Sequence, residues 1–96
     1  MQAVIEKKRR EAHASGRALL VKFTASWCAP CKAIAPKVAA ATAGPTAPVL
    51  LEIDVDKCTD DVRVSSVPTL RLYRVGSTAP LVHVGAGGID AWLKAM

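Results

Sequence analysis

Two short apolar segments, residues 18–24 and 48–53, flank an alanine-rich segment with the composition of a helix. Apolar runs of this length, bounded by polar or turn residues, are typical of strands covered on both faces. The helix between them spans residues 28–43 and is expected to end at Gly44-Pro45, a strong terminator followed by a turn. Because a helix connects the two strands, we expect them to be parallel neighbours in a right-handed β-α-β unit.

Further elements are expected on both sides of this unit. Residues 2–15 are good helix formers, and Gly16 is a suitable stop. Residues 54–66 are polar and leave room for one or two helical turns. The rest of the chain predicts two antiparallel strands joined by Gly76-Ser77 and a short closing helix, at residues 69–75, 81–84 and 89–96. This order of elements implies a small mixed sheet with helices on both faces.

The length of the chain is that of one domain, residues 1–96. A domain of this size buries only about 60 to 65 per cent of the surface that its unfolded chain exposes. Half of the residues are hydrophobic but only four are aromatic. We therefore expect a compact core of Val, Leu, Ile and closely packed Ala.

The positive charge of the chain is concentrated near its N-terminus. Lysine and arginine outnumber aspartate and glutamate by 13 to 8, and four of the cations form the run KKRR at residues 7–10. A nucleic-acid site needs a basic surface joined to a recognition motif, and no such motif follows. We interpret the run as a solvated helix face and expect no nucleic-acid partner.

The sequence also indicates the cellular compartment of the protein. Residues 1–17 lack the apolar core and cleavage site of a secretory signal, and no apolar run has the length needed to span a bilayer. Three cysteines, an odd number, fit poorly with a secreted disulfide framework. We expect a soluble cytoplasmic protein with no membrane partner.

Two of the cysteines stand in the hexapeptide WCAPCK, where a strand ends and a helix begins. At that point unpaired backbone N–H groups and the helix dipole favour negative charge, so the Cys28 thiolate is stabilised and is the expected nucleophile. Cys31 follows three residues later on nearly the same helix face. It is close enough to attack a mixed disulfide formed on Cys28 and to release the substrate reduced. The spacing therefore predicts a two-step thiol–disulfide exchange.

A CxxC pair is also half of a zinc site. Structural zinc normally requires four ligands at suitable spacing. The other candidate ligands, Cys58, His13 and His83, are scattered singly along the chain. We therefore predict no metal site.

A second motif, Val67-Pro68-Thr69, lies just before the third expected strand. With it the chain resembles the thioredoxin family over nearly its whole length: WCAPCK corresponds to the family's WCGPCK, and VPT to its cis-proline motif. In the family this proline packs against the cysteine pair, and the residue before it offers backbone hydrogen bonds to an extended substrate segment. The resemblance implies these roles for Pro68 and Val67.

The resemblance also implies a fold. It is the thioredoxin-like α/β fold, with a central mixed sheet of about four strands flanked by helices. The family's usual opening strand is not evident before the first helix and is expected to be missing. The segment between Cys58 and Pro68 is a few residues shorter than in cytosolic relatives. Loss of an edge strand favours marginal stability or edge pairing between copies, although we expect a monomer.

Other positions match the family residue by residue. Pro36 resembles the proline that kinks the active-site helix, Asp54 the acid that ends the following strand, and Gly85 the glycine beside the substrate groove. Pro36 also has a purely structural interpretation, because a mid-helix proline bends the helix. We interpret Trp27 as a partly exposed lid on the site. The substrate-binding residues implied are Trp27, Ala29, Pro30, Val67, Pro68 and Gly85, beside a redox disulfide Cys28–Cys31.

The expected function is reduction of protein disulfides by thiol–disulfide exchange, without a bound cofactor. The resemblance implies electrons from NADPH through a thioredoxin reductase, and disulfide-containing client proteins such as peroxidases. One alternative is a binding or scaffold module that keeps the fold with little turnover. Another is a dedicated partner of a peroxidase, fed by a different dithiol carrier.

One position departs from the family. A buried aspartate that helps to move the proton of the resolving cysteine usually stands six residues before the first cysteine, where this chain has Lys22. Leu50 stands where many bacterial members have a lysine, and Glu52 is the nearest candidate carboxylate. Lys22 either snorkels or pairs with Glu52 with little effect, or stabilises the thiolates, or loses its charge on desolvation and acts as the base. The sequence leaves these alternatives open.

The third cysteine, Cys58, lies in VDKCTDD, which resembles a stretch of eukaryotic cytosolic thioredoxins with an extra cysteine. A buried, inert thiol and a site of regulatory oxidation are both open interpretations. His83 is expected to face outward from its strand, and His13 lies on the first helix. Neither is assigned as a base for the cysteines.

Overall fold

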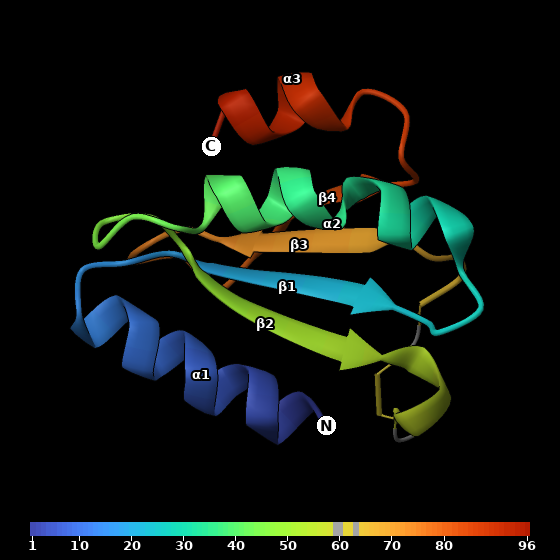
Figure 1. The fold of residues 1–96 in the computed structure, drawn as a ribbon. Helices are drawn as coiled ribbons and strands as arrows, with labels where there is room; N and C mark the ends of the chain where they lie inside the picture. Colours follow the sequence, from blue (N-terminus) through green and yellow to red (C-terminus); the bar gives the residue numbers. More distant parts are fainter. Residues whose placement is uncertain (59–60, 63) are drawn as a thin grey trace.

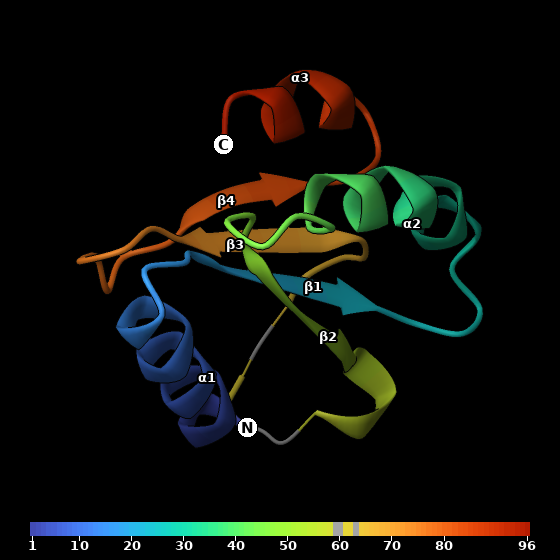
Figure 2. The ribbon, with the colours of Figure 1, turned by 60° about the vertical axis from the view of Figure 1, so that its left-hand side comes forward.

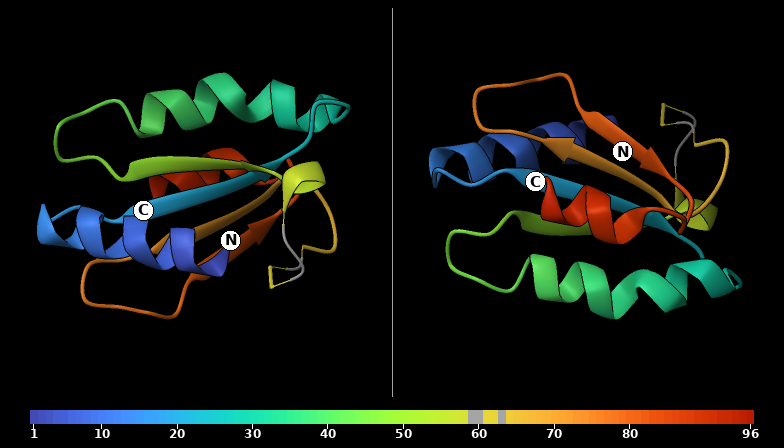
Figure 3. Two further views of the ribbon diagram at one scale, coloured as in Figure 1. Left: turned by 90° about the horizontal axis from the view of Figure 1, so that it is seen from below. Right: turned by 90° about the horizontal axis from the view of Figure 1, so that it is seen from above.

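The computed structural model describes residues 1–58, 61–62 and 64–96. Figure 1 shows a sheet of four strands with α2 and α3 over one face and α1 over the other. The views from below and above show the same layers, with α2 and α3 side by side over one face (Figure 3). The predicted mixed sheet flanked by helices is therefore confirmed.

The sheet has the strand order β2-β1-β3-β4. Its strands are β1 (Leu19–Thr24), β2 (Val49–Asp54), β3 (Thr69–Tyr73) and β4 (Leu81–Val84). β1 and β2 are parallel, β1 and β3 are antiparallel, and so are β3 and β4. The parallel pair and the antiparallel pair predicted from the sequence are both present.

The helices are α1 (Gln2–Ala14), α2 (Ala29–Ala41) and α3 (Ile89–Lys94). Each is slightly shorter than predicted. α1 ends close to Gly16, which has a φ of 72°, a conformation that glycine adopts without the steric cost of a Cβ. Within the described residues no strand precedes α1, as expected from the sequence.

The sheet separates two hydrophobic clusters. Leu19, Val21 and Phe23 of β1 pack on the α1 side, whereas Leu20 packs on the side of α2 and α3. Successive side chains of a strand alternate between the two faces, so both faces of this strand are buried. Lys22 has the same parity as Leu20 and therefore lies on the α2 side.

The run KKRR lies along α1, which Figure 2 shows on the side of the sheet away from α2. Lys7, Lys8 and Arg10 are exposed, and Arg9 is paired with Glu6 at 3.0 Å. The buried residues of α1 are Ile5 and Ala12. Three of the four cations therefore lie on a solvated helix face, as the sequence indicated, whereas Arg9 is partly buried.

The segment after β2 begins with the short 3-10 helix η1 (Val55–Lys57). The shortening expected between Cys58 and Pro68 includes residues 59, 60 and 63, which lie outside the described residues. In the part of the chain that the structure describes, no helix has both the length and the apolar character to cross a bilayer.

Candidate active site

The cysteine pair lies at the junction of β1 and α2. Cys28 is the N-cap of α2, with an extended backbone, and Cys31 lies in the first turn of the helix. Pro30, which lacks an N–H, is tolerated in that turn because the first N–H groups of a helix have no partner within it. A disulfide joins Cys28 and Cys31, whose Cα atoms are 5.3 Å apart. Both cysteines are buried.

Backbone groups around the pair favour negative charge on Cys28. The N–H of Cys31 donates a 3.2 Å hydrogen bond to Cys28 Sγ. The first turn of α2 contains no acidic residue that would oppose an anion. After reduction the same N–H and the positive end of the helix dipole stabilise a thiolate on Cys28.

The loop before β3 lies against this pair. The Val67–Pro68 peptide bond is cis, as the resemblance implied. Val67 packs against a cluster formed by Ala25, Cys28 and Cys31. Pro68 is fully buried, and its carbonyl accepts a 2.8 Å hydrogen bond from the N–H of Gly85. The loop before β3 therefore meets the cysteine pair, and it is tied in turn to the end of β4 through Gly85.

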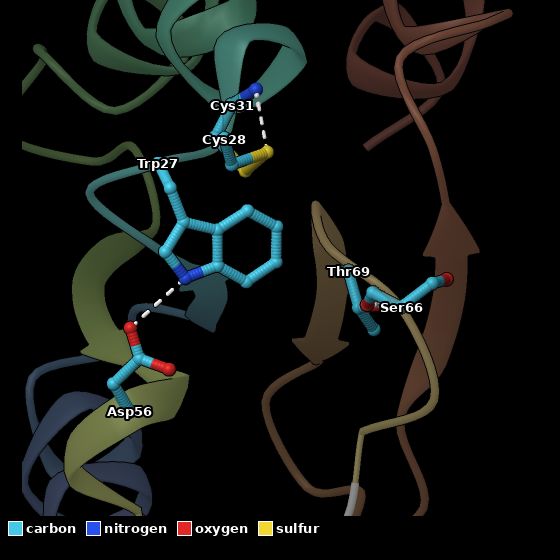
Figure 4. Close-up of a disulfide and its surroundings, with 6 residues drawn as sticks. All are labelled: Trp27, Cys28, Cys31, Asp56, Ser66 and Thr69. Carbon is cyan, nitrogen blue, oxygen red and sulfur yellow. Dashed lines mark hydrogen bonds between the residues drawn. A yellow bond between two sulfur atoms is a disulfide. The ribbon is translucent and has the colours of Figure 1, made fainter.

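The turn that leads into β3 is held by a side chain. Thr69 Oγ1 donates a 2.7 Å hydrogen bond to the carbonyl of Ser66. Figure 4 shows these two residues on the β3 side of the site, across from the disulfide and Trp27. The bond fixes the approach of the chain to Pro68.

Trp27 is exposed and covers one side of the pair. Its exposed fraction is 67%, which agrees with a lid and excludes a core position. Its Nε1 donates a 3.0 Å hydrogen bond to a carboxylate oxygen of Asp56, as drawn in Figure 4. Asp56 lies in η1 and is positioned by its own N–H, which donates to Asp54 at 2.9 Å.

Sequence reasoning missed Asp56. A signal was present, because Asp56 follows the end of β2, and β1 ends beside β2 just before Trp27. The ends of parallel neighbours meet at the same edge of a sheet. Of the residues implied to bind substrate, Ala29 and Pro30 are exposed next to Cys28. Pro36 lies within α2 and is also exposed.

Lys22 is buried in the central strand β1, with an exposed fraction of only 3%. It is paired in register with Glu52 on β2, and both line an open depression of about 300 Å³ together with Cys31. The ion pair between Lys22 and Glu52, one of the alternatives that the sequence left open, is absent: among the described residues no carboxylate lies within 4.0 Å of the ammonium. That alternative was wrong because Glu52 is exposed on the outer strand, whereas Lys22 is buried under α2.

The remaining candidate ligands lie apart from each other. His13 Nε2 is 3.1 Å from the carbonyl of Tyr73, and His83 lies against Trp92 with ring centroids 5.5 Å apart. Cys58 is half-buried, and its thiol donates to the carbonyl of Asp54 at 3.7 Å. Among residues 1–58, 61–62 and 64–96 no three His, Cys, Asp or Glu side chains form a group that could hold a metal ion.

The thiol of Cys58 is less acidic than a free cysteine. Burial, followed by the negative charge of Asp54, raises its pKa, and Asp61 acts in the same direction. The N-terminal ammonium opposes them. Because the thiolate is the species that reacts with oxidants, this environment favours the inert interpretation of Cys58.

A cysteine pair at a helix N-terminus, joined as a disulfide and packed against the loop of a cis-proline, can exchange electrons with other disulfides. On a mixed sheet with helices on both faces, these features define a dithiol–disulfide exchange protein. Comparisons with known proteins give the family. The sequence model of the family described as "Thioredoxin" matches residues 3–95.

Individual relatives agree. A thioredoxin of Echinococcus granulosus is 40% identical over 90 residues, which cover 88% of this chain and 84% of the relative. The crystal structure of Fasciola hepatica thioredoxin has a TM-score of 0.75 at 31% identity and covers 98% of this chain and 88% of its own. A poplar thioredoxin h has a TM-score of 0.72 at 31% identity, with coverages of 99% and 87%.

The chain therefore belongs to the thioredoxin family. It is a protein thiol–disulfide oxidoreductase whose redox-active pair is Cys28 and Cys31. Family membership implies client proteins that contain disulfides, and thioredoxins bind no prosthetic group.

Proposed function

We propose that this protein works as a disulfide reductase, with Cys28 as the attacking thiolate and Cys31 as the resolving thiol. The observation that carries the proposal is the 3.2 Å hydrogen bond from the Cys31 N–H to Cys28 Sγ at the N-terminus of α2. A donor in this position favours the anion on Cys28 rather than on Cys31.

The reaction has two steps. The Cys28 thiolate attacks one sulfur of a client disulfide, and the other client sulfur leaves as a thiolate that takes up a proton. Cys31 then loses its proton, and its sulfur forms a bond with Cys28 Sγ while the bond from Cys28 to the client breaks. The client leaves with two thiols, and the protein is left with the disulfide Cys28–Cys31.

The client is proposed to bind around the pair, next to Trp27, Ala29, Pro30, Val67, Pro68 and Gly85, of which Trp27, Ala29 and Pro30 are exposed and Pro68 is buried. Among the described residues no hydrogen bond engages the backbone of Val67. Its N–H and carbonyl are therefore available to an extended client segment, in the manner of an added strand. The contact of Val67 with the cysteine cluster brings such a segment next to the reacting sulfur.

The electrons are proposed to come from NADPH through a thioredoxin reductase, and the clients to include peroxidases. A dithiol that must be kept reduced is consistent with the cytoplasm. We propose a monomer, because one of the two edge strands, β4, has only four residues and short edges resist pairing. Size-exclusion chromatography with light scattering tests the monomer, and a dimer mass would contradict it.

Two assays test the function. Reduction of insulin by dithiothreitol should be accelerated by the wild-type protein and not by Cys28→Ser. No acceleration by the wild type would support a scaffold module instead. Turnover with NADPH and a thioredoxin reductase tests the electron source. Activity with dithiothreitol but not with the reductase would indicate a carrier fed by another dithiol protein.

A further inference from the structure

A buried cation lies on the same side of the sheet as the resolving cysteine. Lys22 belongs to the central strand β1, and only 3% of it is exposed. Its neighbours in register are Glu52 on β2 and Leu70 on β3. Lysine is almost never buried to this extent without a partner, because removing an ammonium from water is costly.

The Lys22 ammonium opens onto the depression that it shares with Cys31. Among the described residues, the buried side-chain polar atoms without a hydrogen-bond partner are Nε of Arg9 and Nε2 of His83. The Lys22 ammonium is not one of them, although no described residue hydrogen-bonds to it. It therefore meets solvent within the depression, at the end of a buried stem.

The charges around this depression are few. β2 contributes Glu52 and Asp54, α2 contributes Lys32 beside Cys31, and β1 contributes Lys22 itself. β3 presents the apolar Leu70 on this side. Neither carboxylate lies within 4.0 Å of the Lys22 ammonium. In the disulfide form both sulfurs are neutral, so this cation has no close counter-ion.

The exchange cycle creates an anion in the wall of this depression. During resolution Cys31 loses a proton and becomes a thiolate, and Cys31 is one of the lining residues. A cation nearby favours that deprotonation and stabilises the reduced form relative to the disulfide. The depression is open to solvent, which provides a route by which the proton leaves.

We propose that Lys22 is a positioning residue for resolution, with its ammonium as the counter-ion of the Cys31 thiolate. This inference rests on the proposed role of Cys31 as the resolving thiol. In this protein, electrostatic stabilisation by the Lys22 cation takes the place of the proton removal that a buried acid performs in other members of the family. The pair is accordingly easier to reduce than it would be with a neutral residue at position 22.

The test compares three variants of the full chain. Lys22→Met removes the charge at similar length, Lys22→Arg keeps it, and Lys7→Met removes one charge from the exposed face of α1. The pH dependence of mixed-disulfide resolution is measured by stopped-flow with a client disulfide. The redox equilibrium with glutathione is measured in parallel.

In Lys22→Met we expect the midpoint of the resolution pH profile to rise by about one pH unit. The glutathione equilibrium should shift several-fold toward the disulfide form. Lys7→Met should have the midpoint and the glutathione equilibrium of the wild type. Lys22→Arg should stay close to the wild type in both measurements, because it keeps the charge. Lys22→Gln repeats the measurement if Met alters the packing under α2.

If Lys22→Met and Lys22→Gln both keep the midpoint and the glutathione equilibrium of the wild type, the counter-ion role is overturned. Insulin reduction by the wild type would still support the proposed function. Slower resolution at every pH with an unchanged midpoint would also contradict it and would favour Lys22 as a base. If the wild type itself reduces no insulin, the proposed function fails first.

Discussion

The indole Nε1 of Trp27 donates a 3.0 Å hydrogen bond to the carboxylate of Asp56, which ties the loop before α2 to the short helix η1 after β2. The two residues are 29 positions apart in the chain. The ring is 67% exposed, so packing does little to hold it. The orientation of this indole beside the disulfide therefore depends on one charge-assisted hydrogen bond.

We expect Asp56→Asn to weaken client binding more than it weakens the fold. An exposed hydrogen bond contributes only about 0.5–1.5 kcal/mol, so the free energy of unfolding should fall by no more than that. KM for insulin should rise several-fold, and the fluorescence of Trp27 should change. Glu11→Gln on α1 is the matched control. An unchanged KM in Asp56→Asn would show that the indole does not need this carboxylate.

The two active-site cysteines should give different products when each is replaced. Cys31→Ser is expected to form a mixed disulfide with a client and to keep it, because no second thiol can attack Cys28 Sγ. Cys28→Ser should form none, and Cys58→Ser should behave as the wild type. Intact-protein mass spectrometry after incubation with oxidised insulin measures the adduct. A stable adduct on Cys28→Ser would reverse the assigned roles.

Substitution of Gly85, compared with substitution of Gly76, distinguishes an effect on backbone strain from an effect on client binding. Its φ is 86°, and a Cβ there would meet no heavy atom within 4 Å, so Gly85→Ala costs conformational strain and no collision. We expect a loss of about 1–2 kcal/mol in the free energy of unfolding. Gly76→Ala is a matched control with a φ of 82°, equally open and distant from the disulfide. Only Gly85→Ala should also raise KM, and equal KM values would remove Gly85 from the groove.

The environment of Cys58 predicts a pH dependence of stability. Burial and Asp54 raise the pKa of its thiol, so the folded protein holds this proton more tightly than the unfolded chain does. This contribution to stability is fully present below the unfolded pKa and is lost as pH rises through the folded pKa. Urea unfolding at neutral and alkaline pH should show a smaller alkaline loss in Cys58→Ser. The same loss in both proteins would contradict the prediction.

Local sequence patterns were sufficient for the strands and helices. Residues 18–24 and 48–53 are mostly apolar because both faces of β1 and part of β2 are covered, and the strands lie within one residue of the predicted bounds. The position of Cys28 as the N-cap of α2 was also predictable from the local sequence, because it depends only on where the strand ends and the helix begins.

The relationships that depend on tertiary structure were harder to predict. Asp56 meets Trp27 only because β1 and β2 end side by side, so the signal for this pair lies in the pairing of the two strands and in neither segment alone. The sequence alignment placed Leu50 where the family has the residue facing position 22, and Glu52 two residues further along, whereas the structure pairs Lys22 in register with Glu52. Register alone also does not say where a long side chain ends. The exposure of Glu52 and the cover of α2 over Lys22 determine that, and both arise from packing.

Replacement of Lys22 should change stability differently in the two redox states. In the disulfide form the ammonium of this nearly buried lysine has little solvent and no close counter-ion, so Lys22→Met should raise the free energy of unfolding by about 1 kcal/mol. In the reduced form above neutral pH the thiolate compensates the cation, and the gain should shrink or vanish. Urea unfolding of both forms, with Lys7→Met as the control, measures the difference. If Lys22→Met gains the same free energy of unfolding in both redox states, the ammonium does not interact with the sulfurs. Only such an interaction would make the effect of the charge depend on the reduction of the disulfide.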